Sequence, residues 1–305
     1  MATRQMRRLL GGELLLYVVL SAWLLAYRGW TPGEAASLAL GSFLGIRLFV
    51  TALTCTLMLV DADVVPAELQ IGPVRALRIA LEEYAGLIAL FAVIQPFEAF
   101  WLGPDRLSKS TGVRPPLLLI HGYQCNRGFW FWLRPRLEAA GWTVATHNLE
   151  AVWGNIDDYA QGIERRIDEV LAATGARQVI LVGHSMGGLV LRAYLRRYGR
   201  DKVARIVTLG SPHQGTRLAC LGLGRNARQM RIGSSWLAAL ARPGAAPLPS
   251  GSVSIFSCHD NYVFPQRACS TLEGAINVAI GGVSHLGMAF SPVVLGKLLE
   301  ALEES

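Results

Sequence analysis

The sequence predicts an α/β protein with a mostly parallel sheet covered by helices on both faces, preceded by a hydrophobic helical membrane region. Apolar residues make up 52% of the 305 residues and are concentrated in the first hundred positions. From residue 114 onward, short apolar runs alternate with helical patterns, and Ser185 lies between glycines where one run meets a helical pattern. We therefore expect a membrane-associated region, 1–102, a linker, 103–116, and a globular domain, 117–305.

The first apolar stretch, residues 9–27, carries a single charge, Glu13, and follows Arg4, Arg7 and Arg8. As a helix it would span about 28 Å, close to the hydrocarbon thickness of a bilayer. A secretory signal peptide has the same basic start. Because no small-residue cleavage site precedes the next apolar stretch, we favour an uncleaved anchor.

Two further apolar stretches, 35–60 and 84–97, follow in the sequence. The first of these is long enough to span, but Arg47 would cost about 2.5–3.5 kcal/mol at the bilayer centre unless it snorkels or the span shifts toward Val60. The other is short, and we expect it to end at Pro96. It can be a short span, an interfacial helix or a helix packed on the globular domain.

The basic residues at the N-terminus suggest an orientation, since Arg4, Arg7 and Arg8 favour a cytoplasmic start. Two crossings would place Ser185 in the cytoplasm and three would place it outside. The two arrangements are nearly balanced. We favour three, with Trp101 in the headgroup region, and expect a multi-pass protein of the cytoplasmic (inner) membrane with its globular domain on the periplasmic, external side.

Charge and cysteine usage narrow the class of partner. The formal net charge is +7, but lysine and arginine are scattered rather than clustered, so we expect no nucleic-acid partner. The five cysteines form no CxxC pair and no metal-ligand spacing, so we expect no metal. Protein partners are not specified by these features.

The globular half has a regular order of elements. Apolar runs predict strands at 116–121, 143–148, 178–183, 203–209, 252–257 and 276–280. Helical patterns occupy 129–140, 156–173, 186–198 and 292–303. This alternation predicts a parallel sheet with helices on both faces.

The stretch LVGHSMGGLV, 181–190, places Gly183, Ser185 and Gly187 at alternate positions between an expected strand and an expected helix. In that setting G-x-S-x-G forms a strained turn that exposes the serine hydroxyl as a nucleophile. Side chains at the two glycine positions would collide with neighbouring backbone. The alternative is a glycine-rich turn with a bystander serine.

A serine nucleophile needs a base, and the chain order in such folds is serine, acid, histidine. His213, His259 and His285 lie downstream of Ser185. His285 follows the last expected strand and a glycine pair, and we predict it as the base. His259 directly precedes Asp260, too close for the two to act on one site.

The acid should end the preceding strand. Asp260 does so, and its carboxylate would hold the imidazole in the required tautomer; Glu273 is the alternative. For the oxyanion we predict the backbone N–H groups of Met186, after the nucleophile, and Tyr123, after the first strand. His121 is expected to brace that loop.

These segments together resemble the bacterial lipase/esterase branch of the α/β-hydrolase superfamily. LLLIHGY is similar to its oxyanion segment and LVGHSMGG to its nucleophile turn. TLGSPHQGT, HDNYVFP and GGVSHLGM are similar to further segments, the last two carrying the acid and the base. The resemblance covers about residues 114–304 and implies an α/β-hydrolase fold and ester hydrolysis. The hydrophobic first hundred residues fall outside it.

In this fold an insertion after the fourth strand commonly forms a cap, and residues 215–250 interrupt the strand rhythm here. We predict that Met230, Trp236 and Leu237 bind the substrate; the alternative is that they fill a second small core. The expected function is a membrane-anchored lipase or carboxylesterase that acts on lipid or other acyl esters without a cofactor. A thioesterase, an acyltransferase and a non-catalytic membrane scaffold are the alternatives.

Overall fold

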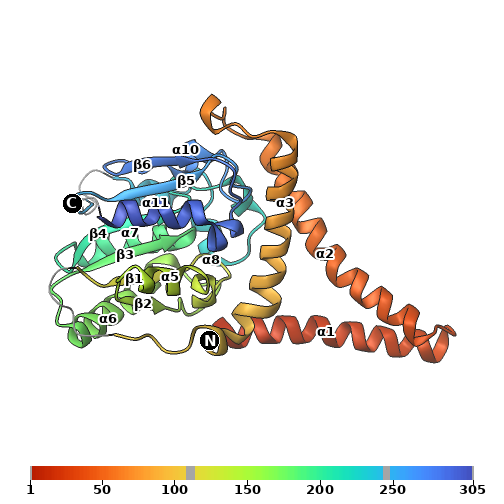
Figure 1. Cartoon of the computed structure of the whole chain (residues 1–305). Helices are drawn as coiled ribbons and strands as arrows, with labels where there is room; N and C mark the ends of the chain where they lie inside the picture. Colours follow the sequence, from red (N-terminus) through yellow and green to blue (C-terminus); the bar gives the residue numbers. More distant parts are fainter. Residues whose placement is uncertain (1, 108–113, 243–247, 304–305) are drawn as a thin grey trace.

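A computed structural model describes residues 2–107, 114–242 and 248–303. Figure 1 shows an α/β domain from which two long helices project to one side, while a third runs along the domain. Parts of four predicted regions lie outside the described residues: residue 1 of the membrane-associated region, 108–113 of the linker, 243–247 of the cap, and the last two positions of the globular domain.

The predicted parallel sheet is confirmed. Its six strands run in the order β2-β1-β3-β4-β5-β6, and every neighbouring pair is parallel. The strands are β1 (Leu117–Ile120), β2 (Val144–His147), β3 (Val179–His184), β4 (Val203–Leu209), β5 (Val253–Ser257) and β6 (Ile276–Ile280). All of β1 and β3 is buried, which explains their continuous apolar sequences.

Helices cover both faces of the sheet, as predicted. Leu117 and Leu119 of β1 point to the core shared with α5 (Leu133–Ala139) and α11 (Pro292–Glu303). Leu118 and Ile120 point to the opposite core, shared with α6 (Ile156–Thr174) and α7 (Met186–Tyr198). The period-two alternation of strand side chains thus divides one apolar run between two cores.

Short helices lie in the connections between the longer elements. They are η1 (Ala67–Leu69), η4 (Arg127–Trp130), η5 (Arg217–Cys220), α8 (Gly224–Gln229), α9 (Ser235–Leu240), α10 (Gln266–Ser270) and η6 (Leu286–Phe290). Three of them, η5, α8 and α9, fall within the predicted cap and give it a helical structure.

Among the described residues, three helical segments are long and apolar enough to cross a membrane. Two are α1 (Ala2–Tyr27) and α2 (Pro32–Val60). Both project from the domain, and they meet at the ends that lie away from it (Figure 1). The guanidinium of Arg47 in α2 forms an ion pair with the Glu13 carboxylate of α1. We refer to α1 and α2 together as the hairpin.

The third segment begins as α3 (Pro73–Ile88) and continues through a π-helical turn, η2 (Ala89–Ile94), a 3-10 turn, η3 (Gln95–Phe97), and α4 (Glu98–Leu102). The predicted end at Pro96 is therefore wrong. Proline lies at the start of the 3-10 turn, where its missing N–H is tolerated. Leu90 and Ile94 join the core beside α5 and α11, so this segment packs on the α/β domain.

Candidate active site

The turn between β3 and α7 has the strained geometry that its glycines predicted. Ser185 has φ 54° and ψ −126°, an unusual backbone conformation for a residue with a side chain. A Cβ atom at Gly183 would lie 2.7 Å from the backbone nitrogen of Gly188, and one at Gly187 would lie 2.5 Å from the Ile120 carbonyl oxygen. Both positions therefore require glycine.

The structure brings Ser185, His285 and Asp260 together at the carboxyl edge of the sheet. His285 Nε2 lies 3.0 Å from Ser185 Oγ, and His285 Nδ1 lies 2.8 Å from Asp260 Oδ2. The backbone N–H groups of Tyr262 and Val263 each donate to Asp260 Oδ1 over 2.8 Å. Asp260 Oδ2 can therefore accept a hydrogen bond from Nδ1–H of the imidazole. In that tautomer the lone pair of Nε2 faces the serine hydroxyl.

Electrostatics favour a basic imidazole at His285. Burial alone would lower its pKa, but the charge and hydrogen bond of Asp260, together with the charge of the nearby Glu83 carboxylate, outweigh burial, and the pKa of His285 is raised. The neighbouring ring of His184 lies 4.6 Å away, and burial lowers its pKa well below the usual value. His184 therefore favours its neutral form beside His285, the one histidine of the described residues whose pKa is raised.

The other predicted candidates lie elsewhere. His259 Nδ1 accepts a 3.0 Å hydrogen bond from the Gly282 backbone, and Glu273 is exposed in the turn before β6. His213 is buried against Thr208 Oγ1 at 3.0 Å. His121 Nε2 accepts the N–H of Leu149 over 2.9 Å, in keeping with the bracing role expected of it.

The loop after β1 lies against the nucleophile. A Cβ atom at Gly122 would come within 2.8 Å of Ser185 Cβ, so only glycine allows this approach. The hydroxyl of the next residue, Tyr123, donates to the Leu223 carbonyl over 2.7 Å and accepts the Leu223 N–H over 2.9 Å. The cap thereby holds the loop that carries one predicted oxyanion donor; the other, Met186, begins α7.

Ser185 and His285 open into a largely apolar cavity of about 510 Å³. Met230 lines it, as do three cap leucines, Leu218, Leu221 and Leu223. The structure places Trp236 and Leu237 elsewhere: the indole N–H of Trp236 donates to Asp157 over 2.7 Å, and Leu237 packs in the core beside α7. Leu237 and Leu240 of the short α9 pack in the core shared with α6 and α7, and neither lines the cavity at Ser185.

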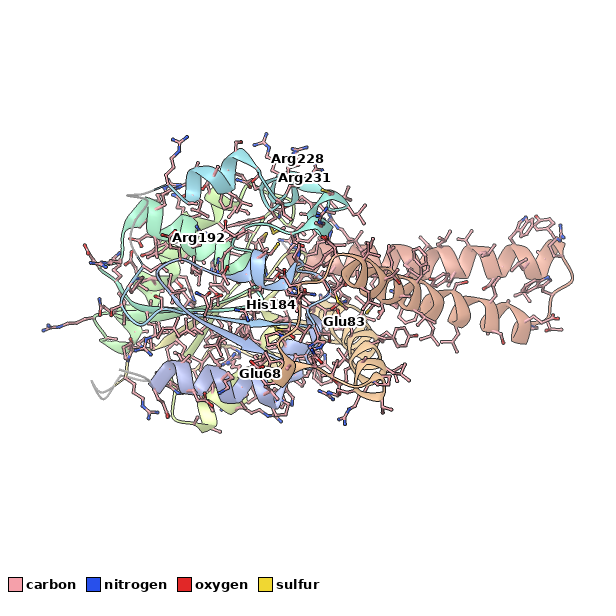
Figure 2. The ribbon with its side chains drawn as sticks, turned by 90° about the horizontal axis from the view of Figure 1, so that it is seen from above. Glu68, Glu83, His184, Arg192, Arg228 and Arg231 are labelled. Atoms are coloured by element: carbon pink, nitrogen blue, oxygen red, sulfur yellow. The ribbon has the colours of Figure 1, made fainter. Side chains whose placement is uncertain are left out.

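Sequence reasoning missed a polar network that reaches the His285 loop from the N-terminal helices. Glu83 of α3 is buried and accepts the N–H groups of Leu286 over 2.9 Å and Gly287 over 3.3 Å. Figure 2 shows Glu83 where the projecting helices meet the α/β domain. The residue after Asp260, Asn261, accepts the His285 N–H over 3.2 Å and donates to Thr54 of α2 over 2.8 Å.

A signal for Glu83 was present in the sequence. Ile79, Glu83, Gly86 and Leu90 lie on one stripe at helical spacing, and all four are buried. A carboxylate on an apolar stripe needs hydrogen-bond donors. The continuous apolar stretch begins only at Tyr84, so a window drawn on composition alone leaves Glu83 outside it.

The described residues contain no group of three or more histidine, cysteine, aspartate or glutamate side chains arranged to hold a metal ion. The groups that meet at the cavity wall are the Ser185 hydroxyl and the His285 imidazole, which is bonded to the Asp260 carboxylate.

A family model described as alpha/beta hydrolase fold matches residues 115–252. The chain has the α/β-hydrolase fold. Triacylglycerol lipases of Pseudarthrobacter phenanthrenivorans and Burkholderia plantarii are each 33% identical over 117 residues, which is 36% of this chain. The chain spans about a third of these curated relatives, 36% and 32% of their lengths.

Solved structures give the same fold. Aspergillus fumigatus lipase B superposes with a TM-score of 0.58 at 19% identity, covering 66% of this chain and 56% of that one. Bacillus licheniformis lipase BlEst2 in its mature form superposes with a TM-score of 0.55 at 18% identity, covering 66% and 94%.

Proposed function

We propose that this protein is a membrane-anchored serine ester hydrolase, a lipase or carboxylesterase of the bacterial lipase/esterase type. The observation that carries the proposal is the hydrogen-bonded series Ser185, His285 and Asp260 at the wall of an apolar cavity. Similarity to bacterial triacylglycerol lipases supports an acyl ester as substrate. The proposed catalytic domain begins at residue 117, after the linker 103–116, with 215–250 as its cap.

In the proposed mechanism, Ser185 Oγ attacks the acyl carbonyl carbon while His285 Nε2 takes the hydroxyl proton. Asp260 stabilises the imidazolium that results, and the N–H groups of Tyr123 and Met186 stabilise the oxyanion. His285 then gives its proton to the departing alcohol, leaving an acyl-enzyme. A water molecule, deprotonated by His285, releases the fatty acid and restores Ser185.

The test is hydrolysis of p-nitrophenyl esters from acetyl to palmitoyl, with labelling by a fluorophosphonate. Ser185→Ala and His285→Ala should each lower kcat by about 10⁴ or more, and the double variant should be little worse, because the groups act as a unit. Ser235→Ala, on an exposed position of α9, is the matched control. Full activity and labelling of Ser185→Ala would refute Ser185 as the nucleophile, whereas a wild-type protein with neither activity nor labelling would favour a scaffold.

We also propose that the hairpin crosses the membrane and that the α/β domain lies in the cytoplasm. Thr3, next to the basic N-terminal residues, accepts a 3.3 Å hydrogen bond from Asn126 of the domain. Asp63, just after α2, accepts the N–H of Ala268 over 3.0 Å. Both ends of the hairpin therefore contact the same domain, which supports two crossings rather than the three favoured from the sequence.

The position of α3 supports this arrangement, because both of its ends also contact the domain. Arg75, near its start, donates to the Gly282 carbonyl over 2.7 Å. Gln95 of η3, at the other end of the same helical segment, accepts the Asn126 N–H over 2.7 Å. Because Arg4, Arg7 and Arg8 lie at the domain end of α1, the positive-inside rule supports a cytoplasmic domain.

Alkaline phosphatase fusions test the orientation. A fusion inserted after Gly29, between α1 and α2, should be active, and one after Ser305 should be stably expressed but inactive. A green fluorescent protein at Ser305 should fluoresce. Active phosphatase at Ser305 would instead support three crossings and an external site.

A further inference from the structure

The cavity at Ser185 has two different walls. One wall comes from the α/β domain and its cap. The other comes from the N-terminal helices, whose contributing residues are Val50, Leu53 and Thr54 of α2, Leu87 of α3 and Phe91 of η2. Four of these five side chains are apolar. The helices proposed to anchor the protein thus also bound the space into which the serine opens.

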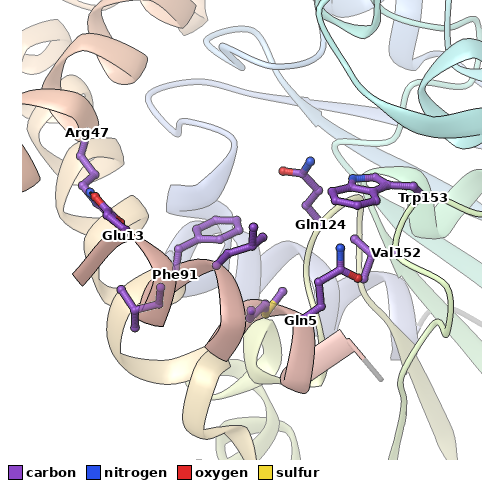
Figure 3. Close-up of a pocket in the computed structure, with 10 residues that line it drawn as sticks. Gln5, Glu13, Arg47, Phe91, Gln124, Val152 and Trp153 are labelled. Carbon is purple, nitrogen blue, oxygen red and sulfur yellow. The ribbon is translucent and has the colours of Figure 1, made fainter. Parts of the chain in front are cut away.

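A second cavity, of about 160 Å³, adjoins the first. Figure 3 shows it between α1, Arg47 of α2 and the loops that carry Gln124, Val152 and Trp153. Phe91 and Gln124 line both cavities, so these two side chains separate the space at Ser185 from the space at the base of the hairpin. The two cavities therefore lie in series.

The outer cavity is suited to an apolar chain. Met6, Leu9 and Leu10 of α1 form its wall, and its two charged groups, Glu13 and Arg47, neutralise one another. Beyond it, the hairpin presents many exposed large apolar side chains, including Leu14, Leu15, Leu16, Val18 and Val19 of α1. Such a surface is stable in contact with lipid rather than with water.

We propose that an acyl chain enters laterally from the bilayer between α1 and α2, passes Phe91, and lies along α2 and α3 with its ester carbonyl at Ser185. The substrate class is then a long-chain acyl ester dissolved in the membrane. This inference rests on the proposed hydrolase function. What it adds is the route and the phase from which the substrate comes.

Two tryptophan substitutions test the route, one in each cavity. Leu53→Trp would narrow the inner cavity, and Leu10→Trp would narrow the outer one. The measurement is kcat/KM of the full-length protein in phosphatidylcholine nanodiscs for p-nitrophenyl palmitate and p-nitrophenyl acetate. We expect each substitution to lower the palmitate-to-acetate ratio by about tenfold or more, because only the long chain needs both cavities.

Matched controls lie on the same helices. Leu48→Trp on α2 and Leu15→Trp on α1 alter exposed residues outside both cavities and should leave the ratio unchanged. An unchanged ratio in both Leu53→Trp and Leu10→Trp, or an equal loss of both activities in both variants, would overturn the lateral route. The hydrolase proposal would survive that result as long as Ser185→Ala is inactive.

Discussion

The hairpin and α3 have similar apolar sequences but different relations to the α/β domain. Along most of the hairpin the apolar side chains are exposed, and an ion pair between Glu13 and Arg47 joins α1 to α2. Along the segment from α3 to η3, the buried polar groups Glu83 and Gln95 bond to loops of the domain. Length and apolar composition alone therefore do not separate helices that project from the α/β domain from a helix that packs on it.

The difference has a physical basis. A buried carboxylate or amide is tolerated only where donors and acceptors are fixed around it. Glu83 has such partners at Leu286 and Gly287, two hundred positions along the chain. We therefore expect substitutions on α3 to affect catalysis and substitutions in the hairpin's ion pair to affect stability.

Of these variants, the largest loss of activity is expected from Asp260, the carboxylate of the α/β domain that bonds to His285. Asp260→Asn should fold normally and lose about 10³–10⁴ in kcat, because the amide can favour the wrong imidazole tautomer. Circular dichroism checks the fold and ester hydrolysis checks the activity. Glu273→Gln, in an exposed turn, is the control; full activity of Asp260→Asn would move the role of the acid to another carboxylate.

A smaller effect is expected from α3. Glu83→Gln keeps the shape of the side chain but weakens its hold on the N–H groups of Leu286 and Gly287, so we expect kcat to fall by about tenfold to a hundredfold through misplacement of His285. Glu82→Gln is the control, because Glu82 is paired with Arg78 on the exposed side of α3. Equal behaviour of the two variants would remove α3 from the catalytic unit.

A pH profile separates positioning from general damage. His285 is faced by Asp260 and Glu83, by the neutral ring of His184, and by Tyr262, whose pKa burial raises well above 10. Burial raises the pKa of Glu83, and the neighbouring imidazolium opposes that rise. Both carboxylates in their ionised form stabilise the imidazolium, so loss of the Glu83 charge in Glu83→Gln should lower the pKa of His285. Because the base must be neutral, the acidic limb of kcat/KM should move to lower pH in Glu83→Gln, whereas a purely structural defect would lower the plateau without moving the limb.

The smallest effect is expected from the hairpin. Glu13→Gln leaves Arg47 without its carboxylate, whereas Glu13→Gln with Arg47→Met removes both charges. The single variant should lose about 1 kcal/mol of stability, seen as a fall of about 2–4 °C in Tm, and the double variant should recover most of it. Thermal unfolding in detergent measures this, and additive losses would mean that the pair contributes nothing.

The sequence was sufficient for the α/β domain because its signals are local. Continuous apolar strands, alternating helices and the glycines around Ser185 each act within a few residues, and the chain order then identified His285 and Asp260. The role of Glu83 could not be predicted from the sequence, because its burial depends on the distant loop at 286–287. Trp236 was misassigned because its side chain could pack on either side of the cap, and only the folded chain shows its partner, Asp157.

The contacts of α3 also bear on how this chain can be divided. A protein cut at the composition boundary, with translation starting near residue 114, would keep all six strands and every residue of the proposed triad. It would nevertheless lack the acceptor beneath Leu286 and the partner of Asn126, and would expose Leu286 and Phe129 to water. The shortest form of this chain that folds and is active should therefore begin before α3. Because the segment that starts with α3 is long and apolar, this form needs a detergent or a lipid to stay in solution. Its activity should therefore be stated together with that detergent or lipid.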